Sequence, residues 1–230
     1  CAVDGMCQTA CPVLINTGSL MKRFRREDAN PALAAGWSAA ATGWGAVTRA
    51  GSAALSVASV LPTPAVRAVT DAARAVLGTD TVPRYAAELP GGGTSRKALG
   101  RVVGAAGVEP SAVFLPACVG SMFGPASSDG IGATGAFVRL LERAGVSAIV
   151  PEGIDALCCG TPWSSKGYAK GHATMSARVR AAVSAASRGG ELPVVCDASS
   201  CTEGFSATLR DEGVRVVDAV AFAASALLPH

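Results

Sequence analysis

The sequence predicts an α/β fold, in which helices flank a parallel sheet and an alanine-rich helical zone precedes it. Half of the 230 residues are hydrophobic and only 16% are charged, a composition typical of a folded core rather than of a disordered chain. From about residue 99 onward, short apolar runs alternate with amphipathic segments, which is typical of strands and helices in a parallel sheet. Earlier in the chain, prolines and glycines divide an alanine-rich stretch into pieces of helical length.

These patterns divide the chain into three parts. Residues 1–18 form a short cysteine-rich segment, residues 19–98 a helical connecting region, and residues 99–230 an α/β domain. Within the connecting region a glycine-rich loop at 89–94 is predicted to be a linker. Helix stops are expected near Pro31, Pro62, Pro64 and Gly78.

The elements of the α/β domain follow in order along the chain. The run Ala112-Val-Phe-Leu115 is continuous and apolar, which suits a strand buried on both faces. Ligands in such sheets bind beyond the carboxyl ends of the strands. Strands are predicted at 112–115, 147–150, 193–196 and 214–217, and helices at 135–144, 176–187 and 202–212.

A first group of chemically active residues lies at the start of the chain, which reads Cys1-Ala-Val-Asp4-Gly-Met-Cys7-Gln-Thr-Ala-Cys11-Pro12. Bacterial ferredoxins bind a cluster with C-x2-C-x2-C-x3-C-P, and this run matches that motif except that Asp4 replaces the second cysteine. A carboxylate oxygen can bind iron, although it is a harder ligand than thiolate. Asp4 is therefore a ligand, or marks an open or three-iron site, or is only a turn residue. We expect an iron–sulfur cluster here, of the [4Fe-4S] type.

A second group consists of Cys118, the pair Cys158-Cys159 and Cys201. Adjacent thiolates can bind neighbouring irons, and Gly160 after the pair allows close approach of the backbone. Cys201 lies where a helix is predicted to begin, and a helix N-terminus stabilises thiolate. Zinc is the rival metal, but tetrahedral zinc sites usually come as paired CxxC units, which are absent here.

Three further residues have weaker signals. Cys196 lies inside a predicted strand, so we interpret it as a small buried hydrophobic residue outside the metal group. Lys166 follows the Cys-Cys-Gly loop and could supply positive charge to a reduced cluster or to a carboxylate substrate; the alternative is a surface lysine. His172 has no evident triad partner, which favours a structural role.

At these residues the chain resembles a known family. The runs Phe114-Leu-Pro-Ala-Cys118, Leu157-Cys-Cys-Gly-Thr-Pro-Trp-Ser-Ser-Lys-Gly167 and Val195-Cys-Asp-Ala-Ser-Ser-Cys-Thr202 resemble the cysteine-rich CCG domain of heterodisulfide reductase and glycolate oxidase iron–sulfur subunits. The run from Asp4 to Gly18 is similar to the ferredoxin segment of fused FAD/iron–sulfur D-lactate dehydrogenases. One departure stands out, because the family motif ends in C-x2-C and Ala198 stands in the place of its first cysteine.

The resemblance implies an electron relay. Flavin reduced by a 2-hydroxy acid elsewhere in a parent protein would pass electrons through iron–sulfur clusters to a quinone or another acceptor. The FAD-binding dehydrogenase domain would be a partner, and we expect this chain, read as an internal fragment, to be inactive alone. A heterodisulfide-type thiol/disulfide reductase and a structural metal-binding module remain as alternatives.

Composition also sets the expected surroundings. The net charge of +3 and the absence of basic runs with interleaved aromatics exclude a nucleic-acid partner. No signal peptide or spanning segment is evident, and ligand thiols suit a reducing compartment. We therefore expect a bacterial cytoplasmic location, with peripheral association at the inner face of the membrane as an open alternative.

Overall fold

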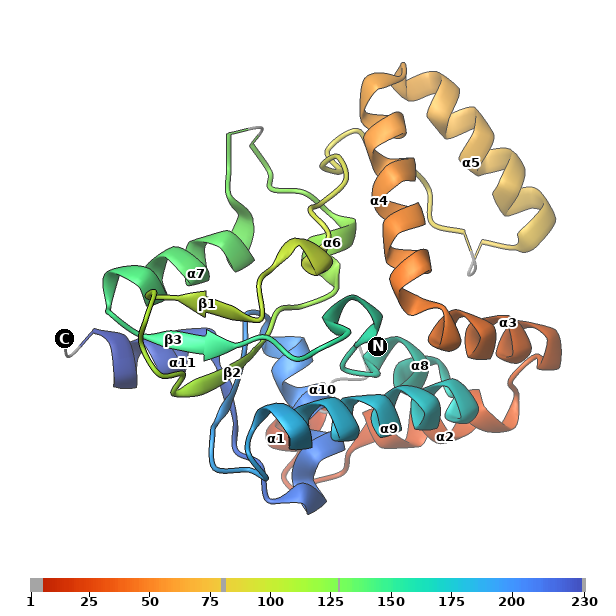
Figure 1. Ribbon diagram of the computed structural model, residues 1–230. Helices are drawn as coiled ribbons and strands as arrows, with labels where there is room; N and C mark the ends of the chain where they lie inside the picture. Colours follow the sequence, from red (N-terminus) through yellow and green to blue (C-terminus); the bar gives the residue numbers. More distant parts are fainter. Residues whose placement is uncertain (1–5, 80–81, 128, 229–230) are drawn as a thin grey trace.

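The computed structural model describes residues 6–79, 82–127 and 129–228, and this part of the chain contains a five-stranded sheet (Figure 1). The strand order is β1-β3-β2-β4-β5, with β1 antiparallel to β3 and the other neighbours parallel. The sheet is therefore mixed, and the α/β prediction is confirmed. The strands are β1 Val102–Gly104, β2 Ala112–Leu115, β3 Ser147–Ile149, β4 Val194–Cys196 and β5 Val216–Asp218.

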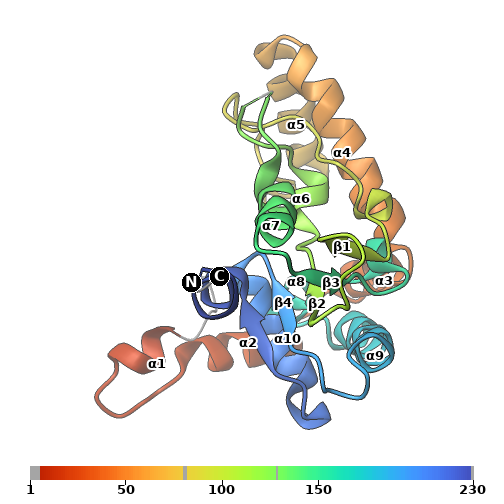
Figure 2. The ribbon, with the colours of Figure 1, turned by 60° about the vertical axis from the view of Figure 1, so that its left-hand side comes forward.

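Helices cover both faces of the sheet, which explains why β2 is apolar throughout. All four residues of β2 are buried, and Phe114 packs against Phe137 of α7, with ring centroids 4.9 Å apart. Figure 2 shows α7 on one side of the sheet and α9 and α10 on the other. The helices of this domain are α6 Val119–Met122, α7 Gly132–Arg143, α8 Thr161–Lys166, α9 Ala169–Ala186, α10 Ser199–Leu209 and α11 Ala219–Phe222.

Proline and glycine set the helix boundaries in the N-terminal part, as predicted. Pro31 is the first residue of α3, where its missing N–H costs nothing, and Asn30 caps that helix. Pro64 lies in the first turn of α5, and Gly78, with a φ of 88°, ends it. The helices are α1 Met6–Ala10, α2 Thr17–Glu27, α3 Pro31–Thr42, α4 Trp44–Val60 and α5 Thr63–Leu77.

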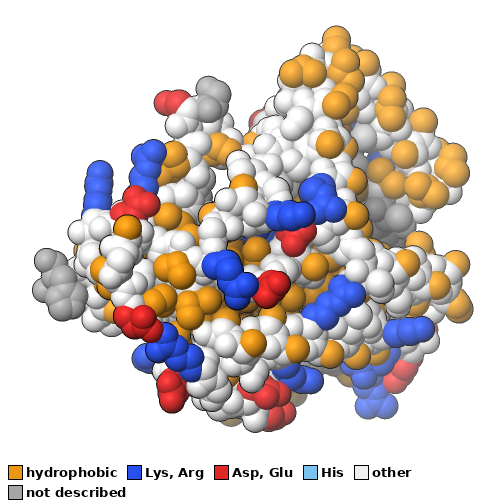
Figure 3. All heavy atoms as spheres, viewed as in Figure 1, with side chains coloured by type: hydrophobic (Ala, Val, Ile, Leu, Met, Phe, Trp, Pro, Cys, Tyr) orange, Lys and Arg blue, Asp and Glu red, His pale blue; other side chains and the backbone are white. Residues whose placement is uncertain are grey.

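The α4–α5 pair stands above the sheet in Figure 1 and carries exposed apolar side chains (Figure 3). No residue of α5 is buried, and Val76 is 83% exposed. Within the described parts of the chain, no helix combines the length and apolarity needed to cross a lipid bilayer.

The structure differs from the sequence prediction at several elements. Helices α7 and α10 begin at Gly132 and Ser199, three residues before the predicted starts at 135 and 202. Strand β1 was not expected, because a run of three residues with one buried side chain, Val103, has too little pattern to detect. Strand β5 begins two residues later than predicted. Helix α9 begins at Ala169 rather than at 176, because Gly171 fits closely against the buried ring of Trp163 and the helix can continue past it.

The glycine-rich loop at 89–94 is packed against neighbouring elements and is not a free linker. It runs between α4 and α6, where Ser52 Oγ donates to the Gly93 carbonyl at 2.9 Å and Gly124 N donates to the Gly91 carbonyl at 2.7 Å. A Cβ on Gly92 would lie 2.1 Å from the Ser52 carbonyl oxygen. The glycines are therefore required by close backbone approach rather than by flexibility.

Tryptophans join the N-terminal helices to the α/β domain. Trp163 of α8 is fully buried, and its Nε1 donates to the carbonyl of Trp37 in α3 at 2.7 Å. The ring of Trp44, at the start of α4, lies 4.7 Å from that of Trp163, centroid to centroid. Such paired aromatics bury a large apolar area in a defined geometry, so α3 and α4 share a core with α8.

The strand order creates a natural site between β2 and β4. The chain leaves β2 to form β3 on one side and then returns to form β4 on the other. Connections therefore diverge beyond the carboxyl ends of β2 and β4, and open α/β sheets bind their ligands at such a point.

Candidate functional site: a buried row of cysteines

Five cysteines gather at the carboxyl edge of the sheet, and none of them is more than 9% exposed. Cys118 follows β2, Cys196 ends β4, Cys201 lies in the first turn of α10, and the pair Cys158-Cys159 precedes α8. Parallel strands bring their carboxyl ends to one edge, which is why residues so far apart in sequence meet.

Two of the sulfurs are in direct contact, and the other thiols interact with their neighbours along a row. Cys118 Sγ lies 3.5 Å from Cys158 Sγ, Cys158 interacts with Cys159, and Cys159 interacts with Cys201. Cys201 in turn interacts with Cys196. We call these five residues the thiol row. The structure thus brings together the four cysteines of the second predicted group.

The prediction that Cys196 stays outside this group is wrong. Cys196 is fully buried, as expected of a strand residue, but its thiol faces that of Cys201. The chain turns directly from β4 into α10, with Cys201 N donating to the Ala198 carbonyl at 3.0 Å. This tight turn folds the first turn of α10 back over the end of β4 and places Cys201 beside Cys196.

Hydrogen bonds between the thiols shift their acidities in opposite directions. Hydrogen bonding with Cys158 and Cys201 lowers the pKa of Cys159 to about 2, and hydrogen bonding with Cys158 lowers the pKa of Cys118 to about 7. The same hydrogen bonds, together with burial, raise the pKa values of Cys158 and Cys201. The row therefore holds thiolate readily at two positions, and thiolate is the form that binds metal or attacks a disulfide.

Arg96 is a buried cation beside the thiol row that no sequence pattern predicts. The residue is only 4% exposed and lies in a short 3-10 helix, Arg96–Ala98, that follows the glycine-rich loop. Its Nη1 donates to the Pro116 carbonyl at 2.8 Å and its Nη2 to the Leu157 carbonyl at 2.7 Å. These carbonyls lie just before Cys118 and Cys158, so one guanidinium holds both cysteine loops.

Burial lowers the pKa of Arg96, while the negative charge of Cys118 and Cys158 opposes that change. The guanidinium in turn helps to lower the pKa of Cys118. Trp44 adds a second donor: its Nε1 has no hydrogen-bond partner among the described residues, and its proximity also lowers the pKa of Cys118. The surroundings of the row therefore favour negative charge on sulfur.

Asp197 ties the strand ends of the site together and was also missed. Its carboxylate accepts hydrogen bonds from Ala117 N and from Thr134 Oγ1, both at 2.6 Å. Ala117 precedes Cys118, and Thr134 lies in the first turn of α7. One side chain at the end of β4 thus fixes the end of β2 and the start of α7.

The turn after the cysteine pair depends on Gly160. Its φ is 83°, in the left-handed region, and a Cβ there would lie 2.9 Å from His172 Cδ2. His172 thus packs over the Cys-Cys-Gly turn, which agrees with the structural role predicted for it. Burial is the main cause that lowers the pKa of His172, with Arg180 next.

We expect Gly160→Ala to destabilise the fold by about 1–3 kcal/mol, because the new Cβ meets both the backbone restriction and the imidazole. Gly36→Ala is the matched control, since Gly36 lies inside α3 with nothing within 4 Å of the added Cβ. That change should raise stability by up to about 1 kcal/mol. Urea denaturation of the two variants measures both effects, and an unchanged midpoint for Gly160→Ala would contradict the role given to this turn.

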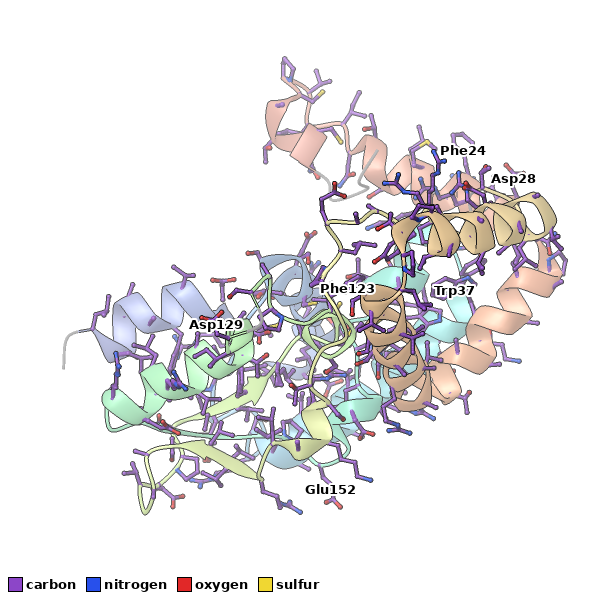
Figure 4. The ribbon with its side chains drawn as sticks, turned by 90° about the horizontal axis from the view of Figure 1, so that it is seen from above. Phe24, Asp28, Trp37, Phe123, Asp129 and Glu152 are labelled. Carbon is purple, nitrogen blue, oxygen red and sulfur yellow. The ribbon has the colours of Figure 1, made fainter. Side chains whose placement is uncertain are left out.

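The first predicted group is only partly described. Cys1 and Asp4 lie outside the described residues. Cys7 lies in α1 and Cys11 follows it, both half-buried. Thr17 Oγ1 donates to Cys7 Sγ at 2.8 Å, and this hydrogen bond is the main cause that lowers the pKa of Cys7. Helix α1 extends away from the sheet in Figures 2 and 4, so this helix, which carries Cys7, lies apart from the thiol row.

Lys166, predicted as a cofactor contact, is exposed at the end of α8. Its Nζ lies 5.7 Å from the centroid of the Trp37 ring, a cation–π arrangement. A role toward a cofactor stays a prediction.

The geometry of possible metal sites and comparisons with known proteins complete the description of the site. Among the described residues, no group of three or more His, Cys, Asp or Glu side chains is arranged to hold a single metal ion. Comparisons of the chain with protein families, with curated proteins and with solved structures find no match.

Proposed function

We propose that this chain binds an iron–sulfur cluster at the thiol row and relays electrons within an FAD-dependent D-lactate or other 2-hydroxyacid dehydrogenase. The electrons would pass from flavin to a quinone or another acceptor. The observation that carries the proposal is the convergence of five buried cysteines at the carboxyl edge of the sheet, with a buried arginine beside Cys118 and Cys158.

The donor set fits such a cluster. Thiolates are the soft ligands that iron–sulfur clusters require, and two positions of the row carry depressed pKa values. Cys118, Cys158, Cys159 and Cys201 would hold the cluster, with Cys196 as a fifth neighbour. The bound cluster supplies one-electron redox chemistry. Arg96 and the unpartnered Nε1 of Trp44 would balance its negative charge, and burial would keep water away from it.

The rest of the assembly follows from the resemblance. Cys1, Asp4, Cys7 and Cys11 would hold a second cluster of the [4Fe-4S] type, and FAD would belong to a dehydrogenase domain in the same parent chain or a partner subunit. We propose a cytoplasmic location; peripheral association at the inner face of the membrane is the alternative. Substrate oxidation then requires the flavoprotein, and the chain alone would be inactive.

Anaerobic reconstitution with iron and sulfide tests the proposal. The desalted chain should retain both elements, become paramagnetic on reduction by one electron, and accept electrons from photoreduced free FAD. Retention of zinc in preference to iron, with no electron uptake from reduced flavin, would support the structural metal-binding alternative. Lactate-dependent dye reduction by the purified chain alone would contradict the assignment of the flavin to another domain.

A second function, thiol/disulfide exchange, has one observation in its favour. Cys118 Sγ lies 3.5 Å from Cys158 Sγ, and the pKa of Cys118 is lowered to about 7, so a reactive thiolate has a resolving partner at hand. The metal-free chain distinguishes the two proposals. Catalytic reduction of a small disulfide by the metal-free chain, at a rate unchanged by added iron and sulfide, would favour exchange over electron relay.

A further inference from the structure

Helix α2, Thr17–Glu27, turns its large apolar side chains to solvent. Leu20 and Phe24 are each 48% exposed, and Met21 is 37% exposed. With 3.6 residues per turn, these three side chains fall within an arc of about 100° on one side of the helix. Figure 4 shows Phe24 at the edge of the molecule. A surface helix ordinarily presents such a stripe to the core, so α2 has an unpartnered apolar face.

The side of α2 away from this face packs against the end of α8. Gly18 is the buried residue of the helix, and Arg25 Nη1 donates to the Ser165 carbonyl at 2.7 Å. A Cβ on Gly167, directly after α8, would lie 2.6 Å from the backbone nitrogen of Arg26. The helix is therefore fixed to α8 by its glycine and arginine side, and its apolar side cannot turn inward without the loss of these contacts.

The loop before α2 adds three exposed apolar side chains. Val13, Leu14 and Ile15 are 71%, 65% and 55% exposed. Asn16 holds the loop to its neighbours, since its side chain caps α2 and its Nδ2 donates to Gln8 Oε1 of α1 at 3.1 Å. We call the exposed apolar side chains of this loop and helix the α2 surface; they are Val13, Leu14, Ile15, Leu20, Met21 and Phe24.

Positive charge accompanies the α2 surface. Arg23 and Arg25 lie on opposite flanks of Phe24 by helical periodicity. Arg23 pairs with Glu27 at 2.9 Å, but their side chains are 75% and 56% exposed, so the pair is weak and the arginine stays available to a partner. Residues 13–28 contain four cations and two acids, and so supply most of the chain's net charge of +3. The cations are Lys22, Arg23, Arg25 and Arg26, and the acids are Glu27 and Asp28.

A surface of anionic lipid matches both the apolar side chains and the charge. The boundary between headgroups and acyl chains accepts the apolar side chains, and the lipid phosphates attract the cations beside them. A symmetric contact between two copies of the chain would instead bring the cations of both α2 helices together, where they repel. The core of a protein interface is depleted in charged residues, and nucleic acid would leave the apolar side chains in water.

We propose that α2 and the loop before it bind the surface of a membrane that contains anionic phospholipids. In this arrangement the helix lies along the surface, with its apolar side chains at the acyl boundary and its cations at the phosphates. With 11 residues the helix is too short to span a bilayer, which takes about 20. Such binding needs neither a cluster nor flavin, so it is independent of the electron relay. It assigns the alternative location, at the membrane, to one surface of the chain.

Sedimentation of the full chain with lipid vesicles tests the α2 surface. The metal-free chain should bind vesicles made of equal parts phosphatidylglycerol and phosphatidylcholine, and should bind pure phosphatidylcholine at least about tenfold more weakly. Sodium chloride at about 0.5 M should weaken the binding to anionic vesicles by a similar factor, because salt screens the attraction between the cations and the phosphates.

Two variants and their matched controls locate the contact. Phe24→Glu should weaken binding at least about tenfold, because it replaces a central apolar side chain with a negative charge. Val76→Glu makes the same kind of change on α5, at a side chain that is 83% exposed, and should alter binding by less than about twofold. Arg23→Gln should weaken binding about threefold to fivefold through loss of one cation. Arg101→Gln removes an arginine that is similarly exposed and likewise paired with a glutamate, and should have no effect.

Absence of binding to anionic vesicles, or equal binding to neutral ones, would overturn the proposal. Wild-type binding by Phe24→Glu, or an equal loss in Val76→Glu, would do the same. A wild-type dimer that Phe24→Glu converts to a monomer, without vesicle binding, would assign the α2 surface to a second copy of the chain. Vesicle binding by a chain that retains no iron after reconstitution would keep the surface and refute the relay. Retained iron without vesicle binding would refute the surface alone.

Discussion

Replacing Arg96 with methionine should destabilise the protein by about 2–4 kcal/mol and raise the pKa of Cys118. The substitution leaves the buried carbonyls of Pro116 and Leu157 without their donors, at about 1–3 kcal/mol each. Part of that loss is offset, because the guanidinium itself is costly to bury, as its lowered pKa indicates. The loss of two buried hydrogen bonds to a charged group should still dominate.

The pKa of the Cys118 thiol distinguishes the loss of the positive charge from a mere change in packing. Arg96 stabilises the Cys118 thiolate, so its removal should move the pKa of Cys118 upward from about 7. At neutral pH the thiolate fraction then falls, and alkylation of the metal-free chain by iodoacetamide at Cys118 should slow. Peptide mass mapping across a pH series measures this, and urea denaturation measures stability.

Two control variants separate charge from geometry. Arg96→Lys keeps the positive charge but lacks the planar guanidinium that donates to two carbonyls at once. This variant should therefore be less stable than wild type, while the pKa of Cys118 stays lowered. Arg101→Met removes an arginine whose side chain is 78% exposed and whose ion pair with Glu152 is on the surface, so stability should change by less than about 0.5 kcal/mol. If Arg96→Met leaves both the free energy of unfolding and the alkylation rate of Cys118 unchanged, the arginine has no part in holding the cysteine loops.

Local chemistry made much of the fold predictable. Pro31 and Pro64 fix helix starts because proline lacks the N–H that a helix interior needs, and Gly78 ends α5 in a conformation that glycine adopts at no cost. The apolar run of β2 identifies a central strand because helices cover both of its faces. The strand order could not be predicted, since no local feature of the β4 sequence indicates that β4 pairs with β2.

The residues that complete the site could not be predicted for the same reason. Arg96 is buried only because two loops far along the chain present carbonyl oxygens to it, and Asp197 acts on α7 through tertiary contact. Cys196 has the pattern of an interior strand residue, and that interpretation of its burial holds. Its contact with Cys201 depends on how sharply the chain turns after β4, which no periodicity records.

Cys159→Ser should abolish the iron held by the thiol row. Cys159 interacts with Cys158 on one side and Cys201 on the other, and its pKa is lowered to about 2, so it is the thiol of the row that ionises most readily. Serine provides a harder oxygen in place of soft sulfur and ionises far less readily, so a cluster would lose its central ligand. Iron and sulfide per chain, measured after anaerobic reconstitution, should fall to the level of the N-terminal group alone.

Cys7→Ser is the matched control, because α1 extends away from the sheet and its cysteine belongs to the other group. This variant should keep the iron that Cys159→Ser loses, and the double variant should keep none. Circular dichroism and urea denaturation of metal-free Cys159→Ser confirm that the fold survives, since the substitution is nearly isosteric. Wild-type iron content in folded Cys159→Ser would show that the row binds no cluster through its central thiolate, and the contact between Cys118 and Cys158 would then be left to thiol/disulfide exchange.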